Sequence, residues 1–78
     1  MIKAVLRYTD CLQDGRNLYE VLTNNKVVIA GTKRGWSMYP RVVILVKDYD
    51  YLSCLLHELN VKCTYEVRLL KYHIVKEH

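Results

Sequence analysis

Residues 41–75 decide the fold, and they read RVVILVKDYDYLSCLLHELNVKCTYEVRLLKYHIV. The run from Val42 to Val46 is wholly branched or apolar, which is typical of a strand that is buried on both faces. Asp48 and Asp50 follow, and either can cap a helix and place negative charge at its N-terminal dipole. We therefore predict a strand that leads directly into a helix.

A stripe of leucines defines this helix. The stripe has the spacing i, i+3, i+4, i+7 of one buried helix face, and its members are Leu52, Leu55, Leu56 and Leu59. Asn60 is a suitable left-handed terminator, so the last strand is expected to begin at once, at Val61. At Leu69-Leu70 the apolar alternation of this strand slips by one residue, which predicts a β-bulge or the end of pairing there.

The first half of the chain is less decided. Residues 2–8 largely alternate between apolar and polar side chains, which predicts a strand with one solvent-exposed face. Residues 27–30 form a short apolar run that predicts an interior strand. Residues 9–25 fit a short helix with Asp14 as N-cap and Asn24-Asn25 at its C-terminal end. They also fit a hairpin that turns at Asp14-Gly15. We favour the helix.

These elements predict one α+β domain over residues 1–78, with a single-layer antiparallel sheet and helices on one face. The favoured order is the ferredoxin-like βαββαβ, and the hairpin choice would give a β-meander followed by a C-terminal βαβ unit. Helices on one face leave the other face bare, although residues 42–46 supply apolar side chains to both. We expect Val43 and Leu45, or else their neighbours, to be exposed there and covered by a partner or by a second copy in a homodimer.

Composition narrows the class of protein. The net charge of +4 favours an acidic partner, either nucleic acid or an acidic protein face. Three cysteines are a poor disulfide framework, and no apolar run approaches the ~20 residues of a membrane helix. Lys3 and Arg7 fall where a signal peptide would keep its apolar stretch. The expectation is a cytoplasmic protein with no membrane partner.

Catalytic and metal signatures are weak. The set Cys54-x2-His57-x5-Cys63 contains possible ligands, with Cys11 or His73 to complete it, but the usual paired CxxC is missing. The three glycines cannot form a dinucleotide or phosphate-binding loop. No context marks a cysteine or histidine as activated. We expect no enzyme, no catalytic residue, no metal site and no cofactor.

The loop at residues 32–41 is the best candidate binding segment, because it interleaves cations with aromatic rings. Phosphates prefer Lys and Arg, and unstacked bases prefer aromatic faces. The candidate residues are Lys33, Arg34, Trp36, Tyr39 and Arg41.

Within this loop, Arg34-Gly35-Trp36 resembles the start of the basic-Gly-aromatic signature of RNA-recognition motifs. The resemblance covers three residues. It then departs, since Met38 stands where a stacking aromatic belongs and Pro40 interrupts the strand.

Further cations lie on the expected polar faces of the first and last strands and predict a basic sheet face, interrupted by Glu66. These cations are Lys3, Arg7, Lys62, Arg68 and Lys71. Together the features indicate a small non-enzymatic binding module. The leading hypothesis is a protein-binding inhibitor or adaptor, for instance a phage-type antagonist of a host factor. The alternative is a nucleic-acid-binding protein that uses the loop at residues 32–41, and a small enzyme of unknown type comes third.

Overall fold

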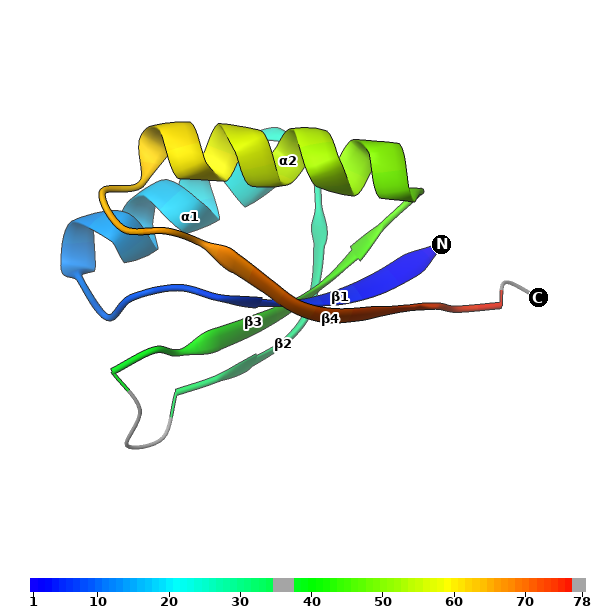
Figure 1. Cartoon of the computed structure of the whole chain (residues 1–78), viewed down its shortest axis with the longest axis horizontal. Coiled ribbons are helices and arrows are strands. Elements are labelled where there is room, and N and C mark those ends of the chain that lie inside the picture. Colours follow the sequence, from blue (N-terminus) through cyan, green and yellow to red (C-terminus); the bar gives the residue numbers. More distant parts are fainter. Residues whose placement is uncertain (35–37, 77–78) are drawn as a thin grey trace.

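The computed structural model describes residues 1–34 and 38–76. Its elements follow the order β-α-β-β-α-β, which is an α+β fold consistent with the ferredoxin-like arrangement. They are β1 (Ile2–Arg7), α1 (Leu12–Asn24), β2 (Val28–Lys33), β3 (Arg41–Val46), α2 (Tyr49–Lys62) and β4 (Arg68–Ile74). The strands form one open antiparallel sheet in the order β2-β3-β1-β4, and both helices lie on the same side of it (Figure 1). The helical interpretation of residues 9–25 is thus confirmed, and the hairpin alternative is wrong.

The core lies between this sheet and the two helices. The central strands β1 and β3 alternate buried and half-buried residues, so every second side chain packs against the helices. The leucine stripe of α2 faces the core as predicted, with Leu52, Leu55 and Leu59 buried and Leu56 packed at the margin. Helix α1 contributes Leu18 as well, and its remaining buried apolar residues are Val21 and Leu22.

The helix ends confirm one capping prediction and correct another. The Asp48 carboxylate caps α2, because it accepts a hydrogen bond from the Tyr51 backbone N–H at 2.8 Å. Asp14 does not cap α1, since that helix begins one turn earlier, after Cys11. The left-handed residue beyond α1 is Lys26, with φ of 56°, and not Asn24 or Asn25.

The prediction that the last strand begins at Val61 is wrong. Helix α2 continues to Lys62, and β4 begins only at Arg68. Residues 63–67 alternate between apolar and polar side chains, but they form the connection from α2 back to the sheet. Side chains of other segments form hydrogen bonds with the backbone of this connection. The Asn60 side chain, for example, accepts from the Val67 N–H at 2.7 Å and donates to the Val67 carbonyl at 3.1 Å.

The predicted bulge is confirmed at the predicted position. Val5 pairs with Lys71 and Leu6 pairs with Leu69, so Leu70 is the extra residue in β4. A second shift in register, which the sequence analysis did not predict, leaves Ala30 as the extra residue of β2.

The prediction that residues 27–30 form an interior strand is wrong. Strand β2 lies at the edge of the sheet, where Val28 and Ile29 are exposed. Branched apolar residues favour a strand at the edge of a sheet as well as at its centre, so their presence does not indicate which position the strand takes.

Candidate nucleic-acid interface

The side of the sheet that faces away from the helices carries three rows of side chains. Directly paired residues of antiparallel strands project to the same face, so the register defines each row. In the order β2, β3, β1, β4 the first row is Val28, Leu45, Lys3 and His73. The second row is Gly31, Val43, Val5 and Lys71. The third row, which we call the basic row, is Lys33, Arg41, Arg7 and Arg68.

The basic row places one cation on each of the four strands. At a strand spacing of ~4.8 Å the row extends about 14 Å across the sheet. Like charges directly opposite each other destabilise a sheet. Among residues 1–34 and 38–76 the only ion pair joins Arg34 and Asp10, so no described carboxylate forms an ion pair with the basic row. The row is therefore a concentration of positive charge that folding alone does not favour.

The centre of the open face is apolar. Val42, Ile44 and Val46 are buried against the helices, so Val43 and Leu45 are the members of β3 that point away from them, as one of the two predicted alternatives requires. Both are half-buried. They adjoin Val5 and are flanked by cations, so the open face combines an apolar centre with a cationic margin. Whether a partner covers Val43 and Leu45 stays a prediction.

The predicted basic sheet face is formed by most of its expected members. Lys3, Arg7, Arg68 and Lys71 lie on it by register. Lys62 does not, because it lies in the last turn of α2. Glu66 precedes β4 and occupies no paired position, so it does not interrupt the face.

The four described residues of the five predicted from the loop at 32–41 separate in the structure. Lys33 and Arg41 pair with each other and belong to the basic row. Tyr39 lies beside that row, since the Arg7 guanidinium carbon lies 4.9 Å from the centre of its ring. Arg34 instead pairs with Asp10 at 3.9 Å. Trp36 lies outside the described residues. Arg7 and Arg68 complete the row, and they were predicted from strand faces and not from the loop.

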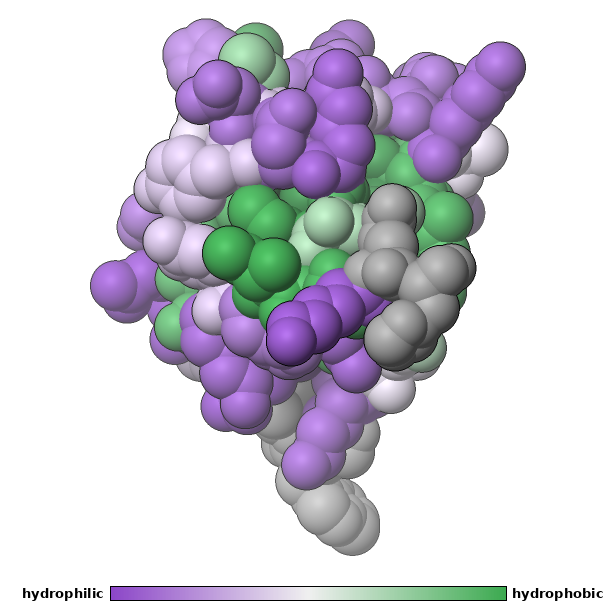
Figure 2. Space-filling model, turned by 90° about the vertical axis from the view of Figure 1, so that its right-hand side faces the viewer, coloured by the Kyte–Doolittle hydropathy of each residue, from purple (hydrophilic) through white to green (hydrophobic). Residues whose placement is uncertain are grey.

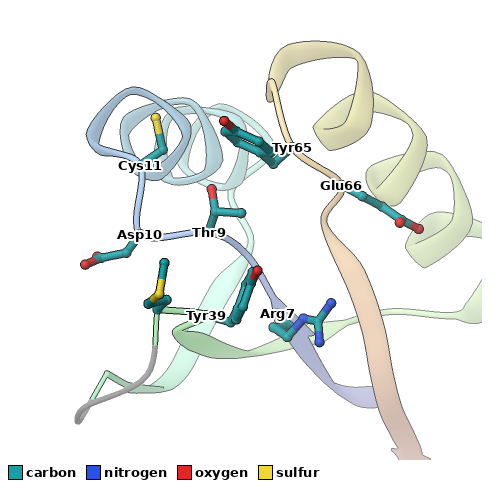
Figure 3. Close-up of a pocket in the computed structure, with 8 residues that line it drawn as sticks. Arg7, Thr9, Asp10, Cys11, Tyr39, Tyr65 and Glu66 are labelled. Atoms are coloured by element: carbon teal, nitrogen blue, oxygen red, sulfur yellow. The ribbon is translucent and has the colours of Figure 1, made fainter.

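A cleft of about 610 Å³ opens next to the basic row at the end of β1 (Figure 3). The chain segments around it are held together by the backbone, since the Tyr8 N–H donates to the Pro40 carbonyl and the Asp10 N–H donates to the Met38 carbonyl. Of its described lining residues, only Tyr39 is among the five binding residues predicted from the loop at residues 32–41. The lining residues are Arg7, Thr9, Asp10, Cys11, Met38, Tyr39, Tyr65 and Glu66.

Asp14 fixes one wall of this cleft. Its buried carboxylate accepts hydrogen bonds from the backbone N–H groups of Thr64 at 2.7 Å and Tyr65 at 2.9 Å, and from the Thr9 hydroxyl at 3.3 Å. Burial acts to raise the pKa of the Asp14 carboxyl, but the bonds from Thr64, Tyr65 and Thr9 outweigh it and lower the pKa below its ordinary value. The connection from α2 to β4, including Tyr65, is thereby tied to α1.

A pair of tyrosines lies on the helix side, near Arg34. The hydroxyls of Tyr8 and Tyr19 are 3.5 Å apart, and the two rings meet edge to face. Burial, followed by the hydrogen bond with Tyr8, raises the pKa of Tyr19 to about 12. The Tyr19 phenol is therefore neutral at physiological pH and adds no negative charge to that side.

The possible metal ligands and nucleophiles are dispersed. Cys54 and Cys11 are exposed, whereas Cys63 is buried and its thiol points to the Asp14 carbonyl. Burial, with a smaller effect of the Asp14 charge, raises the pKa of the Cys63 thiol. His73 lies on the open sheet face. Within the two described stretches of the chain, no three His, Cys, Asp or Glu side chains are grouped so as to hold a metal ion.

Comparison with known protein families gave no match, and no curated protein matches the chain. Neither of the helices in the described stretches is long and apolar enough to cross a membrane.

Proposed function

We propose that this chain is a non-enzymatic module that binds single-stranded nucleic acid on the open face of its sheet. The basic row is the observation that carries the proposal. Lys and Arg side chains neutralise phosphates, and a row of four can follow a short length of backbone. Its position on the one sheet face without helices leaves it accessible.

The apolar centre favours a single strand over a duplex. Unstacked bases present flat apolar faces, whereas a duplex presents mainly phosphates and the edges of its grooves. Val5 and Val43 lie in the row next to the basic row, Leu45 lies one row further, and the three offer such bases a surface to cover. In this arrangement the backbone lies along the cations and the bases lie against the centre of the sheet.

Charge also weighs against a second copy as the partner on this face. Two open faces brought together would place the cations of one copy against those of the other. Like charges across an interface cost binding free energy. A polyanion removes the repulsion within the basic row, whereas a homodimer through Val43 and Leu45 would add to it.

Binding can be measured by fluorescence anisotropy with labelled single strands of about ten nucleotides at low salt. We expect the double variant Arg41→Gln/Arg68→Gln to weaken binding about tenfold or more, since each substitution removes one phosphate contact. The control Arg16→Gln/Lys62→Gln makes the same change in net charge on the two helices and should change affinity about twofold at most. Absence of oligonucleotide binding at low salt, or equal losses in both variants, would refute the proposal.

A protein partner, for which the chain would be an inhibitor or adaptor, is the second candidate. Figure 2 shows hydrophobic side chains gathered at the end of the molecule where the chain begins. Val28 is 55% exposed, and it lies with Ile29 on the edge strand β2. An exposed apolar edge strand can accept a strand from another protein. Hydrogen exchange on a captured complex tests this, since added protection of residues 28–33 is expected and unchanged exchange there would reject it.

A further inference from the structure

We propose that the cleft beside the basic row binds one nucleobase of the strand and selects bases that carry an amino group. This inference rests on the proposed function, because the strand must first be held on the open face. The selected bases are adenine, cytosine and guanine, and the disfavoured ones are uracil and thymine.

Position links the cleft to the phosphate-binding surface. Arg7 belongs to the basic row and also lines the cleft. A nucleotide whose phosphate contacts Arg7 would therefore have its base within reach of the cleft. The volume of about 610 Å³ lies in the range of sites for small organic molecules, so one base fits with space to spare.

Two aromatic rings make the cleft suitable for a flat ligand. Tyr39 is 47% exposed and Tyr65 is 56% exposed, and they come from segments far apart in the chain. Figure 3 shows them on opposite sides of the opening, with Thr9 between them. One face of Tyr39 is covered by the Arg7 guanidinium, and Tyr65 is fixed through its backbone bond to Asp14. Exposed tyrosines held in this way are a stacking platform for bases.

The polar groups of the cleft are the Arg7 guanidinium, two carboxylates from Asp10 and Glu66, and the hydroxyls of Thr9, Tyr39 and Tyr65. The carboxylate oxygens of Asp10 and Glu66 accept hydrogen bonds. The Thr9 hydroxyl donates its proton to Asp14, so the lone pairs of its oxygen are what it can offer a ligand. Carboxylates repel phosphate, which leaves the base as the part of a nucleotide that suits the cleft.

This pattern discriminates between bases. Adenine, cytosine and guanine each carry an exocyclic amino group that can donate to a carboxylate. Uracil and thymine present a carbonyl oxygen there, which a carboxylate repels. We expect a preference on the order of tenfold, because a well-placed pair of hydrogen bonds discriminates between bases by about that factor or more.

The experiment compares labelled oligo(dC) and oligo(dA) with oligo(dT) of the same length, at fixed low salt. Wild-type protein should bind oligo(dC) or oligo(dA) about tenfold more tightly than oligo(dT). Glu66→Gln and Asp10→Asn should each reduce this preference without weakening the binding of oligo(dT). The Asp10 side chain is 61% exposed and Glu66 is also exposed, so both variants should fold, which a melting curve checks. Asp50→Asn, on the exposed first turn of α2, is the matched control and should keep the preference.

The outcomes separate the two proposals. Equal affinity of the wild-type protein for all three oligonucleotides would overturn the inference about the cleft and leave the proposed function intact. A preference that survives both Glu66→Gln and Asp10→Asn would also overturn it. No binding to any of the three would reject the proposed function itself.

Discussion

Replacement of Asp14 by Asn tests how the connection from α2 to β4 is held. The Asp14 carboxylate joins Thr64 and Tyr65 to the first turn of α1, across 50 and 51 positions of the sequence. An Asn side chain has one acceptor oxygen in place of two and puts its amide NH2, which is a donor, against the other backbone N–H. The change keeps the size of the side chain, removes the charge from all three hydrogen bonds that Asp14 accepts, and leaves one backbone N–H without its acceptor.

The expected loss follows from the number of bonds affected. A hydrogen bond to a charged group contributes about 1.5–3 kcal/mol, and a buried N–H left without a partner adds a similar cost. A neutral side chain costs less free energy to bury than a charged one, which offsets part of this loss. We therefore expect Asp14→Asn to reduce the free energy of unfolding by about 2–3 kcal/mol. For a domain of this size that lowers the melting temperature by roughly 10–20 °C.

The pH dependence gives a second measure of the same interaction. Because the folded-state pKa of Asp14 is lowered, the ionised carboxylate stabilises the fold fully above its unfolded pKa of about 3.9. That contribution is lost as the pH falls through the lower folded-state pKa. The difference in stability between wild type and Asp14→Asn should therefore be complete at neutral pH and shrink below about pH 4.

Thermal and urea denaturation followed by circular dichroism measure both effects, with Asp50→Asn as the control because Asp50 is an exposed carboxylate. Asp50→Asn should change the free energy of unfolding by about 0.5 kcal/mol at most. The reasoning would be refuted if Asp14→Asn had the same melting temperature as the control, or if its loss of stability relative to wild type did not change with pH.

Three further predictions follow from the same structure. If all four cations of the basic row contact phosphates, a plot of the logarithm of the binding constant for a single strand against the logarithm of salt concentration should have a slope of about −2.8. The binding constant then falls roughly 50-fold between 50 and 200 mM salt, and a flat titration would contradict phosphate contact. Lys26→Gly should raise the free energy of unfolding by up to about 1 kcal/mol in urea titration, because glycine adopts the φ of 56° without strain, and a destabilised variant would count against this. Asn60→Ala should lower it by about 1–3 kcal/mol, since the Val67 N–H loses its partner, and an unchanged midpoint would show that this bond is dispensable.

Local patterns were enough to predict much of this fold. The apolar run at residues 42–46, the leucine spacing of α2 and the phase slip at Leu70 each concern neighbours within a few positions of one another. The end of α2 was misplaced because alternation over residues 61–67 is a local signal too, and the bonds that hold this segment off the sheet come from elsewhere. The partners of Asp14 lie 50 and 51 positions away, which no periodicity could indicate.

The candidate site was predictable in its chemistry but not in its arrangement. Cations in the loop at residues 32–41 and on the faces of the outer strands were identified from the sequence. Their alignment depends on the register between strands and on the order β2-β3-β1-β4. A one-residue change in either register would move Lys33 or Arg68 to the other face. The cleft was missed because its lining comes from three separate segments.

Each cation of the basic row comes from a different strand, so the row exists only while all four strands are paired. In the unfolded chain Arg7 and Arg68 are separated by most of the sequence and repel each other little. An anion that recognises the row therefore binds the folded state in preference to the unfolded state, and must raise the melting temperature as its concentration rises. The protein would then be least stable when its open face is empty, and ligand binding would offset the charge repulsion present in the free fold.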